Sequence, residues 1–267
     1  MTQPSRGRVE GIGYDPSMTT LTYQGHSCLT LNLPGGESLL VDPFFSENPV
    51  ATQTAAEQNP TAILLTHGHF DHVGHVSTNE SECQTDLVEI ARQTGCQVVC
   101  NFEIGVWLQS RGVENVHQMQ PGGGFTFPWG RCKMTPAIHG SMLPDGSDGG
   151  VAGGYLLTLD DCVVYLAGDT ALFSDMQLIG DLQDGRQIDL AVLPIGDNFT
   201  MGPHDAYIAA GYLDARQVLP VHYDTWPPIA QDAADWADWV SRETDSEGVV
   251  AAPGDTIAVP ESAVIDN

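Results

Sequence analysis

Short apolar runs separated by turn residues predict β-strands along most of the chain. Residues 19–33 alternate between apolar and polar side chains, which favours a strand or hairpin arm, and residues 62–65 form a continuous apolar run typical of a buried strand. Phe125 and Phe127 alternate in a further hairpin region. Other strands are expected at 38–41, 97–100, 131–137, 154–159, 162–166, 189–193, 217–221, 249–251 and 256–259.

Helical spacing of apolar residues predicts helices between these strands, at 85–94, 102–111, 203–215 and 230–242. In the last of them, Trp236, Trp239 and Val240 are expected to face inward. Strands and helices interleave in both halves, so we predict an α/β fold, a four-layer αβ/βα sandwich of two mixed β-sheets with helices on the outer faces. Residues 1–17 lack periodicity and are expected to be a flexible extension before a single domain at 18–267.

Charge and composition indicate the environment of the protein more clearly than its activity. The 267 residues include 35 Asp and Glu against 9 Lys and Arg, a formal net charge of -26, which favours a halophilic origin because high salt screens self-repulsion. Few cationic side chains disfavour nucleic acid as a partner. We find no apolar stretch suited to a membrane span or signal peptide, so a cytoplasmic protein with six reduced cysteines is expected.

Metal-ligand side chains are concentrated directly after the apolar run at 62–65. His67, His69, Asp71 and His72 fall within six residues. Imidazole and carboxylate groups are ligands for Zn, Mn, Fe or Ni. His67 and His69 can chelate one ion, and Asp71 and His72 can face a second. A polar loop with surface histidines is the alternative, and the density of the cluster argues against it.

Three further residues follow apolar runs in the same way. His139, Asp169 and His222 each come after an expected strand. Alone, each would be read as a structural histidine or a turn residue. Strands that end in His or Asp at one edge of a sheet would build a shared polar cleft, so together these residues predict additional metal ligands.

The motifs that carry these residues resemble a known family. Residues 22–27 (TYQGHS), 40–44 (LVDPF), 66–69 (THGH), 168–173 (GDTALF) and 194–203 (PIGDNFTMGP) are similar to the UPF0173 group of metal-dependent hydrolases in the metallo-β-lactamase superfamily, which is related to UlaG-type lactonases. The resemblance implies two divalent metal ions, with Zn favoured over Mn, Fe or Ni. It implies that one ion is held by His67, His69 and His139, the other by Asp71, His72 and His222, with Asp169 as the bridge.

The same resemblance implies a hydrolase in which a metal-bridging hydroxide cleaves an ester, lactone or phosphodiester bond of a small molecule. Asp71 is expected to combine metal ligation with a catalytic role, orienting the hydroxide or accepting its proton. The alternatives are an RNA- or DNA-processing nuclease on the same fold and a non-catalytic metal-binding protein. The absence of a cysteine at a ligand position disfavours antibiotic hydrolysis, and the scarcity of cations disfavours a sugar-phosphate substrate.

Other polar residues are expected near the site without ligating metal. Asp42 is expected to accept a hydrogen bond from a ligand histidine, or else to cap the turn before Pro43. His26 is interpreted as a catalytic donor to substrate or oxyanion, with a core histidine as the alternative. Asp197, Asn198 and His204 are candidate substrate-binding residues that could instead only shape a turn and a helix start. His75 and His117 are interpreted as structural or surface groups, and a homo-oligomer is compatible with the sequence.

Overall fold

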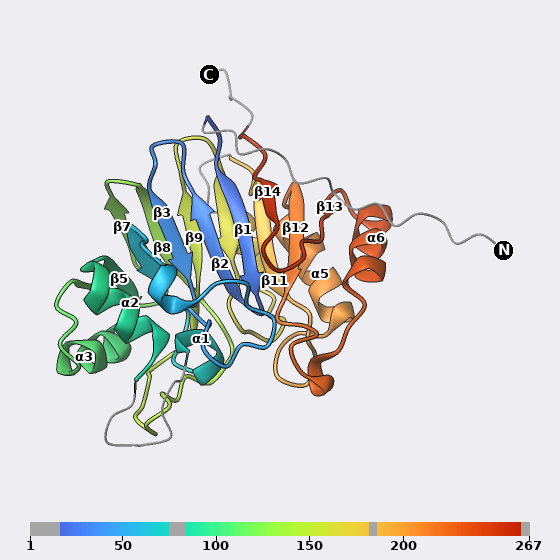
Figure 1. The fold of residues 1–267 in the computed structure, drawn as a ribbon. Coiled ribbons are helices and arrows are strands. Elements are labelled where there is room, and N and C mark those ends of the chain that lie inside the picture. The colour runs from blue at the N-terminus through green and yellow to red at the C-terminus, as the bar shows by residue number, and fades with distance from the viewer. Residues whose placement is uncertain (1–16, 75–83, 182–185, 263–267) are drawn as a thin grey trace.

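Two seven-stranded β-sheets stack face to face in the computed structural model, which describes residues 17–74, 84–181 and 186–262 (Figure 1). The first sheet contains, in spatial order, β14 (Thr256–Ala258), β1 (Thr20–Gly25), β2 (Cys28–Asn32), β3 (Ser38–Val41), β4 (Ala62–Leu64), β5 (Gln97–Asn101) and β6 (Val116–Met119). The second contains β13 (Glu247–Gly248), β12 (Gln217–Val221), β11 (Leu190–Pro194), β10 (Val163–Leu166), β9 (Gly153–Thr158), β8 (Gly130–Pro136) and β7 (Gly124–Phe127). Both sheets are mixed, because β3 to β6 and β10 to β13 run parallel while the other neighbours are antiparallel.

Helices cover the outer face of each sheet (Figure 1). The first sheet carries α1 (Phe70–Val73), α2 (Asp86–Thr94) and α3 (Phe102–Ser110), and the second carries α4 (Met176–Asp181), α5 (Pro203–Leu213) and α6 (Ala233–Glu243). Two short 3₁₀ turns, η1 (Ala55–Glu57) and η3 (Pro227–Ile229), lie in loops. The predicted α/β sandwich is therefore confirmed.

Three apolar clusters hold the four layers together. One lies between the sheets, and the other two lie between a sheet and its helices. The buried Tyr155 of β9 crosses the inter-sheet cluster, and its hydroxyl donates to Leu65 O at 2.6 Å. This bond ties the second sheet to the end of β4, the strand that leads into the histidine-rich segment.

Local capping explains why α2 and α3 begin close to where the pattern places them, whereas α6 begins at Ala233, three residues after the expected start. Thr85 Oγ1 accepts a hydrogen bond from Val88 N before α2, and Asn101 Oδ1 accepts one from Ile104 N before α3. These side chains satisfy amide groups that have no partner within the helix. None of the helices in the described residues is long and apolar enough to cross a bilayer.

Some expected elements are placed differently. The strand expected at 249–251 is wrong: β13 is Glu247–Gly248, where Gly248 is packed so closely against Ala237 of α6 that a side chain would collide with it. β6 and α4 have no counterpart among the expected elements. Trp239 is only half-buried, stacked on Tyr207, whereas Trp236 and Val240 are buried as expected.

Two further expectations concern the cysteines and the chain end. Among the described residues, the buried cysteines are all free thiols, Cys28, Cys96, Cys100, Cys132 and Cys162. Cys83 and nearly all of the expected extension, residues 1–16, lie outside the described residues.

Parallel strands bring the predicted ligands to one edge. Val41 of β3 pairs with Leu64 of β4, and Pro194 of β11 pairs with Val221 of β12. The segments that follow these strand ends contain Asp42, the histidine-rich run and His222. The topology therefore explains how residues far apart in sequence meet.

Candidate metal centre

The first group of ligand atoms comes from three imidazoles. His67 Nε2 lies 3.0 Å from His69 Nδ1, and His139 Nε2 lies 3.2 Å from the same atom. All three ligand atoms lie within 4.8 Å of one another. His67 and His69 follow β4, while His139 follows β8 of the other sheet, so this group spans the two halves of the molecule.

Close packing fixes the turn between His67 and His69. Gly68 N donates to Ser141 Oγ at 3.1 Å, and a Cβ at Gly68 would lie 3.1 Å from Leu143. Ser141 Oγ in turn donates to Gly149 O at 2.8 Å. The loop that follows His139 therefore packs directly on the turn that carries the other two histidines.

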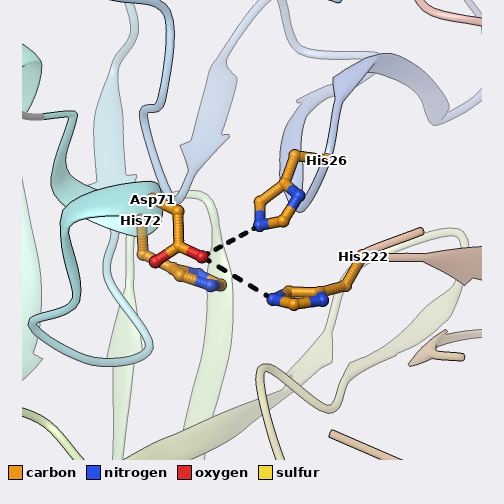
Figure 2. Close-up of side chains that lie close together, drawn as sticks. All are labelled: His26, Asp71, His72 and His222. Carbon is orange, nitrogen blue, oxygen red and sulfur yellow. Dashed lines mark hydrogen bonds and ion pairs between the residues drawn. The ribbon is translucent and has the colours of Figure 1, made fainter. Parts of the chain in front are cut away.

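The second group lies around Asp71, at the start of α1 (Figure 2). His222 follows β12, and its Nε2 lies 3.8 Å from Asp71 Oδ2. His26, from the turn between β1 and β2, places its Nε2 3.2 Å from the same oxygen. With His72, these residues form a set of four whose ligand atoms lie within 4.8 Å of one another.

Asp169 lies between the two groups. Its Oδ2 is 3.1 Å from His222 Nε2 and 3.5 Å from His139 Nε2. Its Oδ1 is 3.3 Å from His72 Nε2. This carboxylate thus faces nitrogens of both groups, which is the position that a bridging ligand requires.

Buried atoms without hydrogen-bond partners test whether the residues fit a cation. His72 Nε2, His222 Nε2 and Asp169 Oδ1 are buried without a hydrogen-bond partner. His72 Nε2 faces Asp169 Oδ1, and His222 Nε2 faces the other oxygen of the same carboxylate, Oδ2. A buried polar atom without a partner costs about 1–3 kcal/mol. A shared divalent cation would satisfy all three atoms, and imidazole with carboxylate suits Zn, Mn, Fe or Ni. The residues therefore fit a metal centre.

Asp42 sets the orientation of the ligand histidines. Its Oδ2 lies 2.8 Å from His72 Nδ1 and accepts from Thr66 Oγ1 at 2.7 Å. Because the Thr66 hydroxyl proton points to Asp42, Thr66 Oγ1 accepts from His67 Nδ1 at 3.0 Å. Protons on both Nδ1 atoms leave both Nε2 lone pairs available for metal.

The electrostatics divide the histidines into two classes. Burial, followed by the repulsion of neighbouring histidines, lowers the pKa of His67 and His69, and burial lowers the pKa of His139 although Asp169 opposes it. These imidazoles are neutral and ready to bind metal.

His72 and His222 form the second class of histidines and, like Asp169, are charged in the metal-free protein. Burial lowers the pKa of His72 and His222, but the carboxylates outweigh it: Asp169 and Asp42 raise the pKa of His72, and Asp169 with Asp71 raises the pKa of His222 to about 9. Burial raises the pKa of Asp169, but His222 and His72 bring it well below its usual range. A cation would take the place of the protons on both histidines.

His26 is buried and held by two contacts. Its Nδ1 lies 2.8 Å from Thr225 Oγ1, and its Nε2 faces Asp71. Burial, followed by the charge of His222, lowers the pKa of His26 to about 4. A neutral His26 with its proton on Nε2 donates to Asp71, and the opposite tautomer would present a lone pair to a cation. The sequence pattern predicted a functional role without metal ligation; the structure places His26 Nε2 within reach of a group that could hold a cation.

The predicted substrate-binding residues lie farther from the His and Asp cluster than the predicted metal ligands do. Asp197 and Asn198 are exposed on a turn whose Met201 N donates to Thr170 O at 2.9 Å, one residue from Asp169. The side chain of His204 is 75% exposed, and its ring lies 6.1 Å from that of Trp239. The structure therefore does not join His204 to the cluster.

His117 lies apart from the ligand sets. His117 packs against Phe125 and Phe127 on the edge strands, which matches the structural interpretation. His75 lies outside the described residues.

Sequence reasoning missed several residues that contact the site. Thr66 and Thr225 orient His67 and His26, and Trp226 packs on His26 with ring centroids 5.1 Å apart. Thr66 belongs to the THGH motif and could have been found as the neighbour of a ligand. Thr225 and Trp226 lie in a loop without periodicity, so no pattern pointed to them.

Comparison with known proteins identifies the family to which the chain belongs. The model of the beta-lactamase superfamily domain matches residues 37–223. A UPF0173 metal-dependent hydrolase from Shouchella clausii (strain KSM-K16) is 43% identical over 242 residues, which cover 89% of this chain and 98% of that protein.

Two solved structures are similar to this chain over most of its length. Igni18, a metallo hydrolase from the archaeon Ignicoccus hospitalis KIN4/I, is 32% identical with a TM-score of 0.78, covering 90% of this chain and 98% of that one. The metallo-beta-lactamase fold protein YhfI from Bacillus subtilis is 14% identical with a TM-score of 0.65 over 90% of this chain and 99% of its own, and it shows the fold alone.

Proposed function

The chain belongs to the UPF0173 family of metal-dependent hydrolases in the β-lactamase superfamily, and from that premise we propose that it uses two divalent cations to hydrolyse an ester, lactone or phosphodiester bond of a small molecule. His67, His69 and His139 would hold one cation. Asp71, His72 and His222 would hold the other, with Asp169 between them. Zn is the favoured metal, with Mn, Fe or Ni as alternatives.

One observation carries the proposal more than any other. Asp169 lies 3.1 Å from His222 and 3.5 Å from His139, and its second oxygen is buried without a hydrogen-bond partner. A single cation would leave part of this arrangement unsatisfied. A carboxylate that faces two sets of nitrogen ligands is the arrangement expected of a two-metal hydrolytic centre.

The residues of the chain have distinct tasks in this proposal. Bound cations supply an activated water and polarise the scissile oxygen. Asp71 offers a carboxylate that can accept the proton of the attacking water and return it to the leaving oxygen. His26, with its Nε2 3.2 Å from Asp71 Oδ2, orients that carboxylate. Asp42 holds His72 and, through Thr66, His67 in the tautomers that ligation needs.

The substrate is expected to be a small molecule of the cytoplasm rather than a nucleic acid. Every ion pair within the cluster joins a His to an Asp, so none of these pairs presents a cation to a phosphate backbone. Asp197 and Asn198, on the turn bonded to Thr170, are proposed to contact the substrate.

The test compares His69→Ala with His117→Ala, a partly buried histidine outside the ligand sets. Metal content and hydrolysis of nitrophenyl esters, lactones and bis(nitrophenyl) phosphate are measured after chelation and metal add-back. His69→Ala should bind less metal and lose turnover, while His117→Ala should keep both.

Three other results would count against the proposal. Wild-type stoichiometry and rate in His69→Ala would refute the ligand assignment. Turnover of RNA or DNA alone would favour the nuclease. A fully metal-loaded protein without turnover of any substrate would favour a non-catalytic role.

A further inference from the structure

An aromatic wall stands beside the second ligand group. Phe44, Phe70 and Trp226 contact one another, with ring centroids 6.2 Å apart for Phe44 and Phe70, 5.8 Å for Phe70 and Trp226, and 6.1 Å for Phe44 and Trp226. The three residues come from the segment after β3, from the first position of α1 and from the loop before η3. Three separate segments thus build one apolar surface.

The wall is joined directly to the proposed reaction centre. His26 contacts Phe44 and Trp226, with ring centroids 5.6 Å and 5.1 Å away, while its Nε2 faces Asp71. Phe70 immediately precedes Asp71 in α1. A molecule that reached Asp71 along this side would therefore lie against aromatic rings.

Part of the wall is open to solvent. Phe44 is buried and supports the other two rings, whereas Phe70 is 48% exposed and Trp226 is half-buried. An exposed aromatic ring beside a polar centre leaves apolar area in water until something covers it. Phe70 also sits in the first turn of a four-residue helix, where it contributes little to the core.

Apolar side chains also flank the first ligand group. Ile138 and Met142, one residue before and three residues after His139, are both largely exposed. Phe199, on the turn bonded to Thr170, is exposed as well. Isolated exposed apolar residues are common, but their position on both sides of a charged centre extends the pattern of the wall.

The charged residues near the site do not favour a substrate with an anionic tail. The residues paired within the cluster are His and Asp, and the guanidinium groups of Arg111 and Arg216 are paired with Asp145 and Asp189. With 9 Lys and Arg in the whole chain, cationic side chains are scarce. The cations would be the main positive charge available, and they are required at the reacting bond.

Resting on the proposed function, we propose that the substrate carries an uncharged apolar group, an alkyl or aryl chain next to the scissile bond, which packs on Phe70 and Trp226. These two residues are specificity-determining: they hold the part of the substrate that does not react. Phe44 supports them from beneath.

Binding of alkyl hydroxamates to the metal-loaded protein tests this without requiring turnover. The hydroxamate group binds metal, so acetohydroxamate reports on the metal centre and longer homologues report on the wall. Each methylene packed on the wall should tighten the Kd by about twofold to fourfold, since burying a methylene is worth about 0.8 kcal/mol. A chain that ends in a carboxylate should bind more weakly than an alkyl chain of equal length.

Substitutions in the aromatic wall test whether it causes the dependence of the Kd on chain length. Phe70→Ala should flatten the dependence on chain length, with acetohydroxamate affinity and metal content unchanged, and Phe70→Leu should restore part of it. Trp226→Ala should also flatten the dependence on chain length; because Trp226 packs on His26, its chain-length dependence is measured relative to its own acetohydroxamate affinity. Leu178→Ala, which removes an equally exposed apolar side chain from α4, is the matched control and should behave as wild type.

The outcomes separate the two proposals. Absence of acetohydroxamate binding would count against the metal centre and hence the proposed function. A Kd that is independent of chain length, a preference for the anionic chain, or an unchanged dependence in both Ala variants would overturn the apolar substrate.

Discussion

Replacing Asp42 by Asn isolates the contribution of an orienting residue from that of the ligands. Asp42 is 1% exposed and accepts three hydrogen bonds, from Thr66 N at 2.8 Å, from Thr66 Oγ1 at 2.7 Å and from His72 Nδ1 at 2.8 Å. Its φ of 46° is left-handed, a conformation that Asn adopts as readily as Asp. The substitution therefore changes the hydrogen-bonding capacity with little change in shape or backbone.

The expected loss follows from the donors that Asp42 satisfies. Asn has one acceptor oxygen, and its NH₂ group would face either Thr66 or His72 Nδ1. If the amide donates to His72 Nδ1, the imidazole proton must lie on Nε2. Nε2 then has no lone pair on the side that faces Asp169. We expect metal affinity to fall by about 10–100-fold. The metal-free protein should lose about 1–3 kcal/mol of unfolding free energy for the unsatisfied buried group.

Chelator competition measures the metal affinity, and thermal unfolding of the metal-free protein measures the stability. Asp86→Asn is the matched control, because Asp86 is a fully buried carboxylate that accepts from Phe45 N, Ser46 N and Ser46 Oγ and, among the described residues, from no histidine. It should be destabilised with metal affinity near wild type. Equal metal affinity in Asp42→Asn and wild type would refute the orienting role.

Three further predictions follow from the site and the surface. In the metal-free protein, the pKa of His222 is raised from 6.5 to about 9, so its contribution to stability is present below pH 6.5 and is lost as the pH rises to 9. Unfolding measured as a function of pH should show this loss. Calorimetry near pH 8 should show that metal binding releases a proton. Gly196→Ala, whose Cβ would collide with His222 O, should lower metal content and stability, whereas Gly211→Ala, in open space on α5, should stabilise by about 0.5–1 kcal/mol in thermal unfolding. With a net charge of -26, Tm should rise steeply from 0.1 M to 2 M KCl, and a flat response would contradict the halophilic interpretation.

The polar residues at strand ends made the site predictable from the sequence. Parallel strands such as β3 and β4 end at the same edge of a sheet, so Asp42 and His67 had to be neighbours once both strands were recognised. The same argument connects β11 and β12 with His222. Apolar runs therefore located the strands, and the residue types that followed located the candidate metal centre.

Other features depend on contacts that no local pattern encodes. β13 lies at Glu247–Gly248, where Gly248 is packed closely against α6, whereas the apolar pattern pointed to residues 249–251. The aromatic wall joins Phe44, Phe70 and Trp226 from three loops or helix starts, each of which reads alone as an ordinary apolar residue. Only tertiary packing reveals that they share a surface.

Three residues of the site have a strained backbone conformation, as do five other non-glycine residues among those described. His26, Asp42 and His222 all have left-handed φ angles, of 60°, 46° and 56°. Such conformations cost non-glycine residues about 1–3 kcal/mol each and persist only where the surrounding contacts impose them. Backbone hydrogen bonds hold the main chain at these positions: His222 N donates to His26 O at 2.9 Å, and Asp42 N donates to Leu64 O at 3.1 Å. Glycine would relieve the strain at each of the three positions but would remove the imidazole or carboxylate that faces the cluster.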